Sequence, residues 1–177
     1  MLFEDGTQNT IVKCVELAEV EVYQPVNMAA NKAVSASSVD SSDYNASKAV
    51  DGIYSANNDM NCWASGLNQD VGSWWKVDLE SNQSIGKVKI QFRGRDDNGM
   101  KYFCVPKNIT FQVSNDNVNW TTFISKSTNV PVENTSYSDA LYTYSIDASG
   151  GYLRLLFEDG TQNTIYKYVE LTEVEVY

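Results

Sequence analysis

The chain has 177 residues and a formal net charge of -10 at pH 7, with 42% hydrophobic and 12% aromatic residues. These values describe a packed globular domain of ordinary size rather than a disordered segment. The negative charge makes nucleic acid and anionic membranes poor partners, because both require clustered cations on the protein. A neutral glycan or a metal ion is a more suitable ligand.

The two ends of the chain carry nearly the same stretch, because residues 2–23 repeat residues 156–177. The two copies differ at three positions: Val12/Tyr166, Cys14/Tyr168 and Ala18/Thr172. A self-match at a fixed offset is typical of repeated modules. We interpret 24–177 as one complete module and 1–23 as the C-terminal remnant of a preceding module. A remnant this short does not fold alone, so we expect it to be frayed, packed on the module, or swapped into another copy as a strand-swapped dimer.

Short runs of alternating apolar and polar residues, rich in β-branched and aromatic side chains, predict β-strands along the complete module. They span 74–79, 86–92, 108–114, 120–125, 142–146, 152–157 and 173–177. Clusters of Asn, Asp, Ser and Gly between the runs supply turns. With one candidate helical turn at 45–52, this pattern predicts an all-β sandwich or barrel.

The composition argues against an enzyme. The chain contains no histidine, which excludes Ser-His-Asp and Cys-His arrangements and zinc sites built on histidine. Asp96 and Asp97 are adjacent on one predicted loop, so they cannot flank a sugar from opposite sides as glycoside hydrolysis requires. The three cysteines, Cys14, Cys62 and Cys104, form no CxxC motif and cannot all pair within the chain.

Eight stretches, taken in order, carry a resemblance to a known family. They are NKAVSASS (31–38), ASKAVDG (46–52), NCWAS (61–65), WWKVDLES (74–81), IQFRGRDD (90–97), ITFQVSNDNVNW (109–120), YLRLLF (152–157) and ELTEVEVY (170–177). They resemble the discoidin domain, also called the coagulation factor V/VIII type C domain, and the related family 32 carbohydrate-binding modules. The resemblance covers 24–177. It implies a jelly-roll β-sandwich of about eight mainly antiparallel strands, with the ligand loops at one end.

Many sugar-binding members of this family hold a calcium ion, which is usually structural. The resemblance places the side-chain donors at Asp51, Asn61 and Glu173, and the backbone donors around Lys48 and Ile53. Calcium takes about 6 to 8 oxygen ligands of these kinds. The family usually has Thr or Ser in place of the Asn61 side chain, and the preceding loop is longer than usual. The loop ligand could therefore shift to one of three nearby residues: Asp59, Asn57 or Asn58. Alternatively, Asp51 forms only a turn and Glu173 is only an exposed strand residue.

A sugar site requires an aromatic face and a few fixed polar groups in a preformed hollow. The polar groups that we expect to bind the ligand are Arg93 or Arg95 with Asp96, Asp97 and Asn98. The candidate ring platforms are Tyr44, Tyr102, Phe103 and Tyr166. Arg95 with Asp96 could equally be an ion pair that fixes the loop. Galactose-binding relatives often use a loop histidine, which argues against galactose here. We expect the four tryptophans to lie in the core: Trp63, Trp74, Trp75 and Trp120.

These observations predict a non-catalytic, lectin-like carbohydrate-binding module of a secreted or cell-surface protein, with a glycan and neighbouring repeat modules as partners. Weak sites that are linked in tandem gain avidity. The alternative is an adhesion or spacer module that binds protein or lipid through the same loops, with GMKYF (99–103) as a membrane-inserting tip. The negative charge makes a membrane the less suitable partner. No apolar run approaches 18 residues and no signal peptide is evident, so we expect any secretion signal to lie outside this chain.

Overall fold

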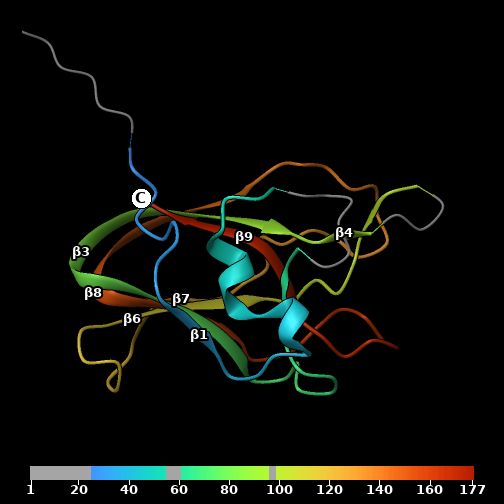
Figure 1. Ribbon diagram of the computed structural model, residues 1–177, viewed down its shortest axis with the longest axis horizontal. Helices are drawn as coiled ribbons and strands as arrows, with labels where there is room; N and C mark the ends of the chain where they lie inside the picture. Colours follow the sequence, from blue (N-terminus) through green and yellow to red (C-terminus); the bar gives the residue numbers. More distant parts are fainter. Residues whose placement is uncertain (1–24, 55–60, 96–98) are drawn as a thin grey trace, which may run out of the picture.

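The computed structural model describes residues 25–54, 61–95 and 99–177 (Figure 1). Within these ranges it contains nine β-strands and two short 3-10 helices. The strands are β1 (Val34–Ala36), β2 (Trp63–Ala64), β3 (Ser73–Phe92), β4 (Gly94–Arg95), β5 (Lys101–Tyr102), β6 (Ile109–Ser114), β7 (Thr121–Ser127), β8 (Tyr142–Phe157) and β9 (Glu170–Val176), and the helices are η1 (Ser42–Tyr44) and η2 (Ala46–Val50). None of the helices in the described ranges is long and apolar enough to span a membrane.

The two longest strands, β3 and β8, contribute to both layers of the sandwich. The first half of β3 pairs with β1 and with the second half of β8, which continues to β6 and β7. The second half of β3 pairs with β9, which continues to β2. Register shifts between Asp78 and Gln83 and between Ile85 and Lys87 accompany the bend visible in Figure 1. All pairings are antiparallel, and the predicted jelly-roll sandwich is confirmed.

The predicted strand runs recur in the structure, but four of them merge into two strands. Residues 74–79 and 86–92 both belong to β3, and 142–146 and 152–157 both belong to β8. The polar and glycine-rich stretches between these runs have the composition of turns. In the structure, however, the stretch in β3 pairs with the stretch in β8, for example Gln83 with Gly150. The predicted helical turn is confirmed as η2.

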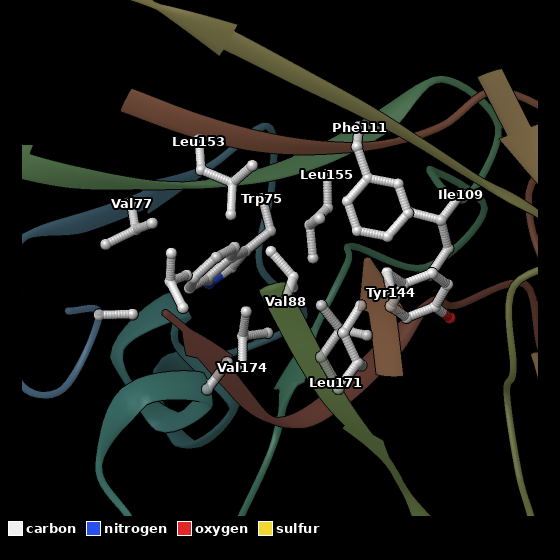
Figure 2. Packing of buried hydrophobic residues seen from close by; sticks show 14 of the residues in the cluster. Trp75, Val77, Val88, Ile109, Phe111, Tyr144, Leu153, Leu155, Leu171 and Val174 are labelled. Carbon is white, nitrogen blue, oxygen red and sulfur yellow. The ribbon is translucent and has the colours of Figure 1, made fainter. Parts of the chain in front are cut away.

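The core lies between the two layers and is drawn in Figure 2. Alternate residues of β3 and β8 point into it, among them Trp75 and Leu153, and β9 adds Leu171 and Val174 from the other layer. Trp63 and Trp75 are fully buried, as expected. The indole nitrogen of Trp75 donates to the carbonyl of Ala46 at 3.0 Å, so this buried ring leaves no unpaired polar atom.

The expectation that Trp74 and Trp120 lie in the core is wrong, because both are only half-buried and lie on the outer surface. Neighbouring residues on a strand point to opposite faces, so the adjacent pair Trp74 and Trp75 cannot both enter the core. The Lys76 ammonium lies 5.1 Å from the Trp74 ring centroid and 6.0 Å from that of Trp120. The Arg154 guanidinium lies 4.1 Å from the Trp120 ring. The exposed indoles are thus stacked with cations.

Candidate functional site

The loop end of the sandwich carries two arginines on one face. Arg93 and Arg95 flank Gly94, and β4 is held against β5 by pairing of Gly94 with Tyr102. A Cβ atom at Gly94 would come within 2.6 Å of the Tyr137 ring, so only glycine allows this close approach. Because alternate residues share a face, the two guanidinium groups point to the same side of the hairpin.

Two aromatic rings lie beside these guanidinium groups, and a third ring packs on one of the two. The Arg95 guanidinium lies 4.7 Å from the Phe103 ring centroid. The Arg93 guanidinium lies 5.6 Å from Phe103 and 5.8 Å from Tyr44. The rings of Phe103 and Tyr166 are 5.5 Å apart. The fold therefore brings together five of the residues that the sequence predicts for a ligand site, and we call them the ring–guanidinium cluster.

Arg93 forms the buried base of the ring–guanidinium cluster. Its side chain is only 9% exposed, and its Nη1 atom donates to Oε1 of Glu170 on β9. Burial raises the pKa of Glu170 to about 7, although the charge of Arg93 opposes this rise. Arg95 is half-buried and more open to solvent. Arg93 therefore supports the cluster, and Arg95 is its more accessible guanidinium.

Tyr166 is the most exposed member of the cluster, with 45% of its surface accessible. Its backbone is nevertheless fixed, because Asn163 Oδ1 accepts hydrogen bonds from the amides of Ile165 and Tyr166 at 2.9 and 2.7 Å. The side-chain amide of Asn163 also donates to Glu133 Oε1. This loop thus presents a preorganised ring to solvent at low entropic cost.

Tyr102, another predicted platform, does not join the cluster. It is 5% exposed, its ring packs 5.0 Å from Tyr137 and 6.3 Å from Tyr142, and its hydroxyl donates to the carbonyl of Ser138 at 3.3 Å. A buried ring cannot offer a face to a sugar. The predicted platform role of Tyr102 is therefore wrong, because its side chain points from β5 into the protein rather than toward solvent. Three sets of residues in the predictions lie outside the described residues: Asp96, Asp97 and Asn98 of the predicted sugar site, Asn57, Asn58 and Asp59 of the predicted metal site, and residues 1–23 of the predicted remnant and strand swap.

A second candidate site surrounds Glu173, whose side chain is completely buried. Its Oε2 atom accepts from the amide of Gly52 at 3.2 Å, which brings the turn after η2 against β9. In that turn Asp51 Oδ1 accepts from the amide of Ile53 at 3.0 Å. The Asn61 side chain donates to the Ile53 carbonyl at 3.1 Å. Asp51, Ile53, Asn61 and Glu173 are predicted metal ligands, and Lys48, the remaining one, lies in η2, which packs on β9.

The environment of Glu173 fits a bound cation. Its Oε1 atom has no hydrogen-bond partner among the described residues, and no cationic side chain of the described part of the chain is ion-paired with it. Burial raises the pKa of Glu173 to about 7, and the charges of Asp51 and Glu175 add to the rise. No group of three or more His, Cys, Asp or Glu residues forms among the residues described. The oxygen-bearing groups of the predicted set are two carboxylates, one side-chain amide and backbone carbonyls, which are the kinds of donor that calcium takes.

Sequence reasoning missed the role of Glu170 as the buried partner of Arg93. It also missed Glu175, which accepts from the hydroxyl of Tyr54 and pairs with Lys89 at 3.2 Å. The available signal was three glutamates among the apolar residues of the closing strand, because buried carboxylates are rarely left without partners.

An antiparallel sandwich with rings and guanidinium groups at its loop end defines a binding module of the galactose-binding-like class. The family model of the F5/8 type C domain matches residues 33–171, and the chain belongs to this family. The expected discoidin resemblance is confirmed. No curated protein matches the chain at a significant level.

The chain is also similar to solved structures. Chitosan-binding module 1 of a chitosanase/glucanase from Paenibacillus sp. IK-5 is 29% identical, with 86% of this chain and 99% of that chain covered and a TM-score of 0.61. Module 2 of the same enzyme, in complex with chitotriose, is 27% identical, with 85% and 99% covered and a TM-score of 0.62. A Streptococcus pneumoniae fucose binding module is 25% identical, with 86% and 94% covered and a TM-score of 0.59.

Proposed function

We propose that the chain is a non-catalytic carbohydrate-binding module that takes a glycan at the ring–guanidinium cluster. The observation that carries this proposal is that three rings from separate segments meet at the two arginines: Tyr44 lies beside Arg93, Phe103 lies beside Arg93 and Arg95, and Tyr166 packs on Phe103. The rings offer faces for the C–H side of a pyranose, and the guanidinium offers hydrogen-bond donors to its hydroxyls. The chitosan-binding and fucose-binding relatives support a glycan ligand, and the net charge of -10 favours a neutral or cationic glycan over an acidic one.

The proposal includes a structural calcium ion held by Asp51, Asn61 and Glu173 with the backbone around Lys48 and Ile53. Its support is the buried, cation-free carboxylate of Glu173 described above. The ion would tie the turn after η2 to β9. Bound only in the folded state, it would stabilise the module without taking part in sugar chemistry.

The proposal also places the module in a secreted or cell-surface protein that contains neighbouring repeat modules. Its support is the near-identity of residues 2–23 and 156–177, from which we infer that 1–23 belongs to one module and 24–177 to the next. Several weak glycan sites on one chain would bind a polymeric glycan with avidity.

Glycan binding is tested on a glycan array and by calorimetry with the glycans that the array identifies. We expect Arg95→Ala and Tyr166→Ala each to weaken binding about tenfold or more, which corresponds to roughly 1.4 kcal/mol. Arg154→Ala and Tyr152→Ala are matched controls, because both residues lie on β8 outside the cluster, and they should bind like the unmodified chain. A silent array together with binding to anionic liposomes would instead support the lipid-binding adhesion alternative. Equal losses in the site and control variants would also contradict the proposal.

A further inference from the structure

The strands β3 and β9 place polar side chains opposite one another on the face of the sheet that is turned away from the core. Alternate residues of both strands enter the core, so the residues between them share the other face. In the register of the two strands, Lys89 lies opposite Glu175, and Gln91 lies opposite Glu173. We call Gln91 and Glu173 the middle pair, because ion pairs lie on both sides of it.

Both neighbours of the middle pair join a glutamate of β9 to a cation of the protein. On one side, Lys89 Nζ lies 3.2 Å from Glu175 Oε2. On the other side, a register shift places two residues of β9 against one of β3. Beyond this shift, Arg93 Nη1 donates to Glu170 Oε1. The middle pair therefore has a neutral amide at the position where the neighbouring pairs on the same face have a cation.

The side-chain amide of Gln91 is buried without a partner. The residue is 1% exposed, and neither its Oε1 nor its Nε2 atom has a hydrogen-bond partner among the described residues. The Oε1 atom of Glu173 is buried and unpartnered in the same way. Residues that lie directly opposite each other in an antiparallel pair have Cβ atoms about 4.5–5.5 Å apart. The two unpartnered oxygens thus belong to neighbouring side chains on one face.

The residue type at position 91 decides how the charge of Glu173 can be met. A lysine or arginine there could neutralise Glu173, as the cations of the neighbouring pairs neutralise their glutamates. Glutamine supplies no positive charge that would repel a metal ion. Its side-chain carbonyl is an oxygen donor of the kind that calcium takes, and buried polar atoms normally have a partner.

We propose that Gln91 makes Glu173 a ligand for an external cation, because it withholds a protein cation from this glutamate and adds its own Oε1 atom as a further calcium ligand. This inference rests on the calcium ion of the proposed function. It assigns to that site a residue of β3, whereas the ligands predicted from the sequence come from η2, the segment that follows it and β9. Gln91 is thereby a specificity-determining residue of the metal site.

The test substitutes Gln91 in the full chain. Each variant is melted in chelator and in calcium chloride, and is titrated with calcium chloride by calorimetry. Gln91→Lys places an ammonium beside Glu173, so we expect it to lose the calcium-induced rise in melting temperature. In chelator it should melt above Gln91→Met, which has a similar length and no charge. Gln91→Met removes only the oxygen donor, and its calcium dissociation constant should rise about tenfold or more.

Two further variants separate the role of Gln91 from general effects of charge and folding. Gln91→Glu keeps the shape of the side chain and adds a carboxylate. We expect it to bind calcium more tightly than the unmodified chain and to melt at a lower temperature in chelator. Gln83→Lys adds the same charge as Gln91→Lys to the same strand, at a half-buried position that pairs with Gly150 of β8. It should keep the full response to calcium.

A full calcium response in Gln91→Lys would overturn the inference and leave the calcium site intact. Unchanged dissociation constants in both Gln91→Met and Gln91→Glu would have the same meaning. Loss of the response in Gln83→Lys as well would attribute the effect to net charge and would also overturn the inference. The absence of any calcium response in the unmodified chain is a different result, because it would overturn the calcium site itself together with the role of Gln91.

Discussion

Glu170 and Glu173 lie three residues apart on β9, and both carboxylates are buried, yet the groups that contact these carboxylates differ. Glu170 receives the guanidinium of Arg93, whereas Glu173 receives the amide of Gly52 and no cation from the described residues. Burial raises the pKa of each to about 7. The difference teaches that one strand can join two kinds of site. Arg93 supplies the protein's own cation beneath the ring–guanidinium cluster, whereas the carboxylate of Glu173 meets no cation from the described residues.

The largest expected effect comes from removing the protein's own cation. Arg93→Met leaves Glu170 buried without a charged partner, and such losses typically cost about 3–5 kcal/mol of unfolding free energy. Urea denaturation of both proteins measures the difference. Adding Glu170→Gln to Arg93→Met should recover part of the loss, because a neutral amide needs no cation. A loss of less than about 1 kcal/mol, the size of an ordinary point substitution, would show that the two buried glutamates do not differ as described.

The next effect concerns the ion proposed at Glu173. Calcium at about one hundred times its dissociation constant should stabilise the fold by about 2.7 kcal/mol. In a domain of this size, such a change raises the melting temperature by about 5–10 °C. Glu173→Gln should remove this response to calcium, whereas Glu158→Gln, at a half-buried surface carboxylate paired with Lys126, should keep it. Equal melting temperatures in calcium and in chelator would contradict the metal site.

A smaller effect is the pH dependence of that response. Because the folded pKa of Glu173 lies above its ordinary value of 4.5, the metal-free fold favours the protonated acid. The stability gained in this way is complete below the unfolded pKa and is lost as the pH rises through about 7. Bound calcium requires the carboxylate, so the calcium-induced rise in melting temperature should be greater at pH 8 than at pH 6. A calcium-induced rise in melting temperature of the same size at pH 6 and pH 8 would show that protonation of Glu173 does not compete with calcium binding.

The sequence predicts which residues form strands better than it predicts where each strand begins and ends. Alternating runs locate most strands because the period of two follows from one buried face. The same rule, applied to adjacent residues, would have placed Trp74 outside once Trp75 was assigned to the core. The merging of four predicted runs into β3 and β8 was not predictable from local pattern. Residues that are common in turns, such as Gln83 and Gly150, remain in the strands because they pair with each other across the bend.

The candidate sites divide in a similar way. Loop arginines and aromatic residues can be identified in the sequence, because few other residue types serve sugar binding. Which rings point outward depends on the register of the strand pairs, and the sequence does not show that register. The sequence therefore predicts Tyr102 in the site, although its ring is buried. The pairing of Arg93 with Glu170 joins residues 77 positions apart, and no local pattern encodes it. The orphan carboxylate of Glu173 likewise appears only when the turn after η2 is folded against β9.

The smallest expected effect is at Thr172, which lies between the two glutamates on β9 and completes the comparison. Its hydroxyl is buried without a partner among the described residues. Thr172→Ala removes a penalty of roughly 1–3 kcal/mol for that hydroxyl, and loses about 0.8 kcal/mol of burial with the methyl group. We therefore expect an unfolding free energy within about 1 kcal/mol of the unmodified chain or slightly above it, whereas Leu171→Ala next to it should cost about 2–5 kcal/mol. A loss in Thr172→Ala as large as that in Leu171→Ala would mean that the hydroxyl has a partner in solution.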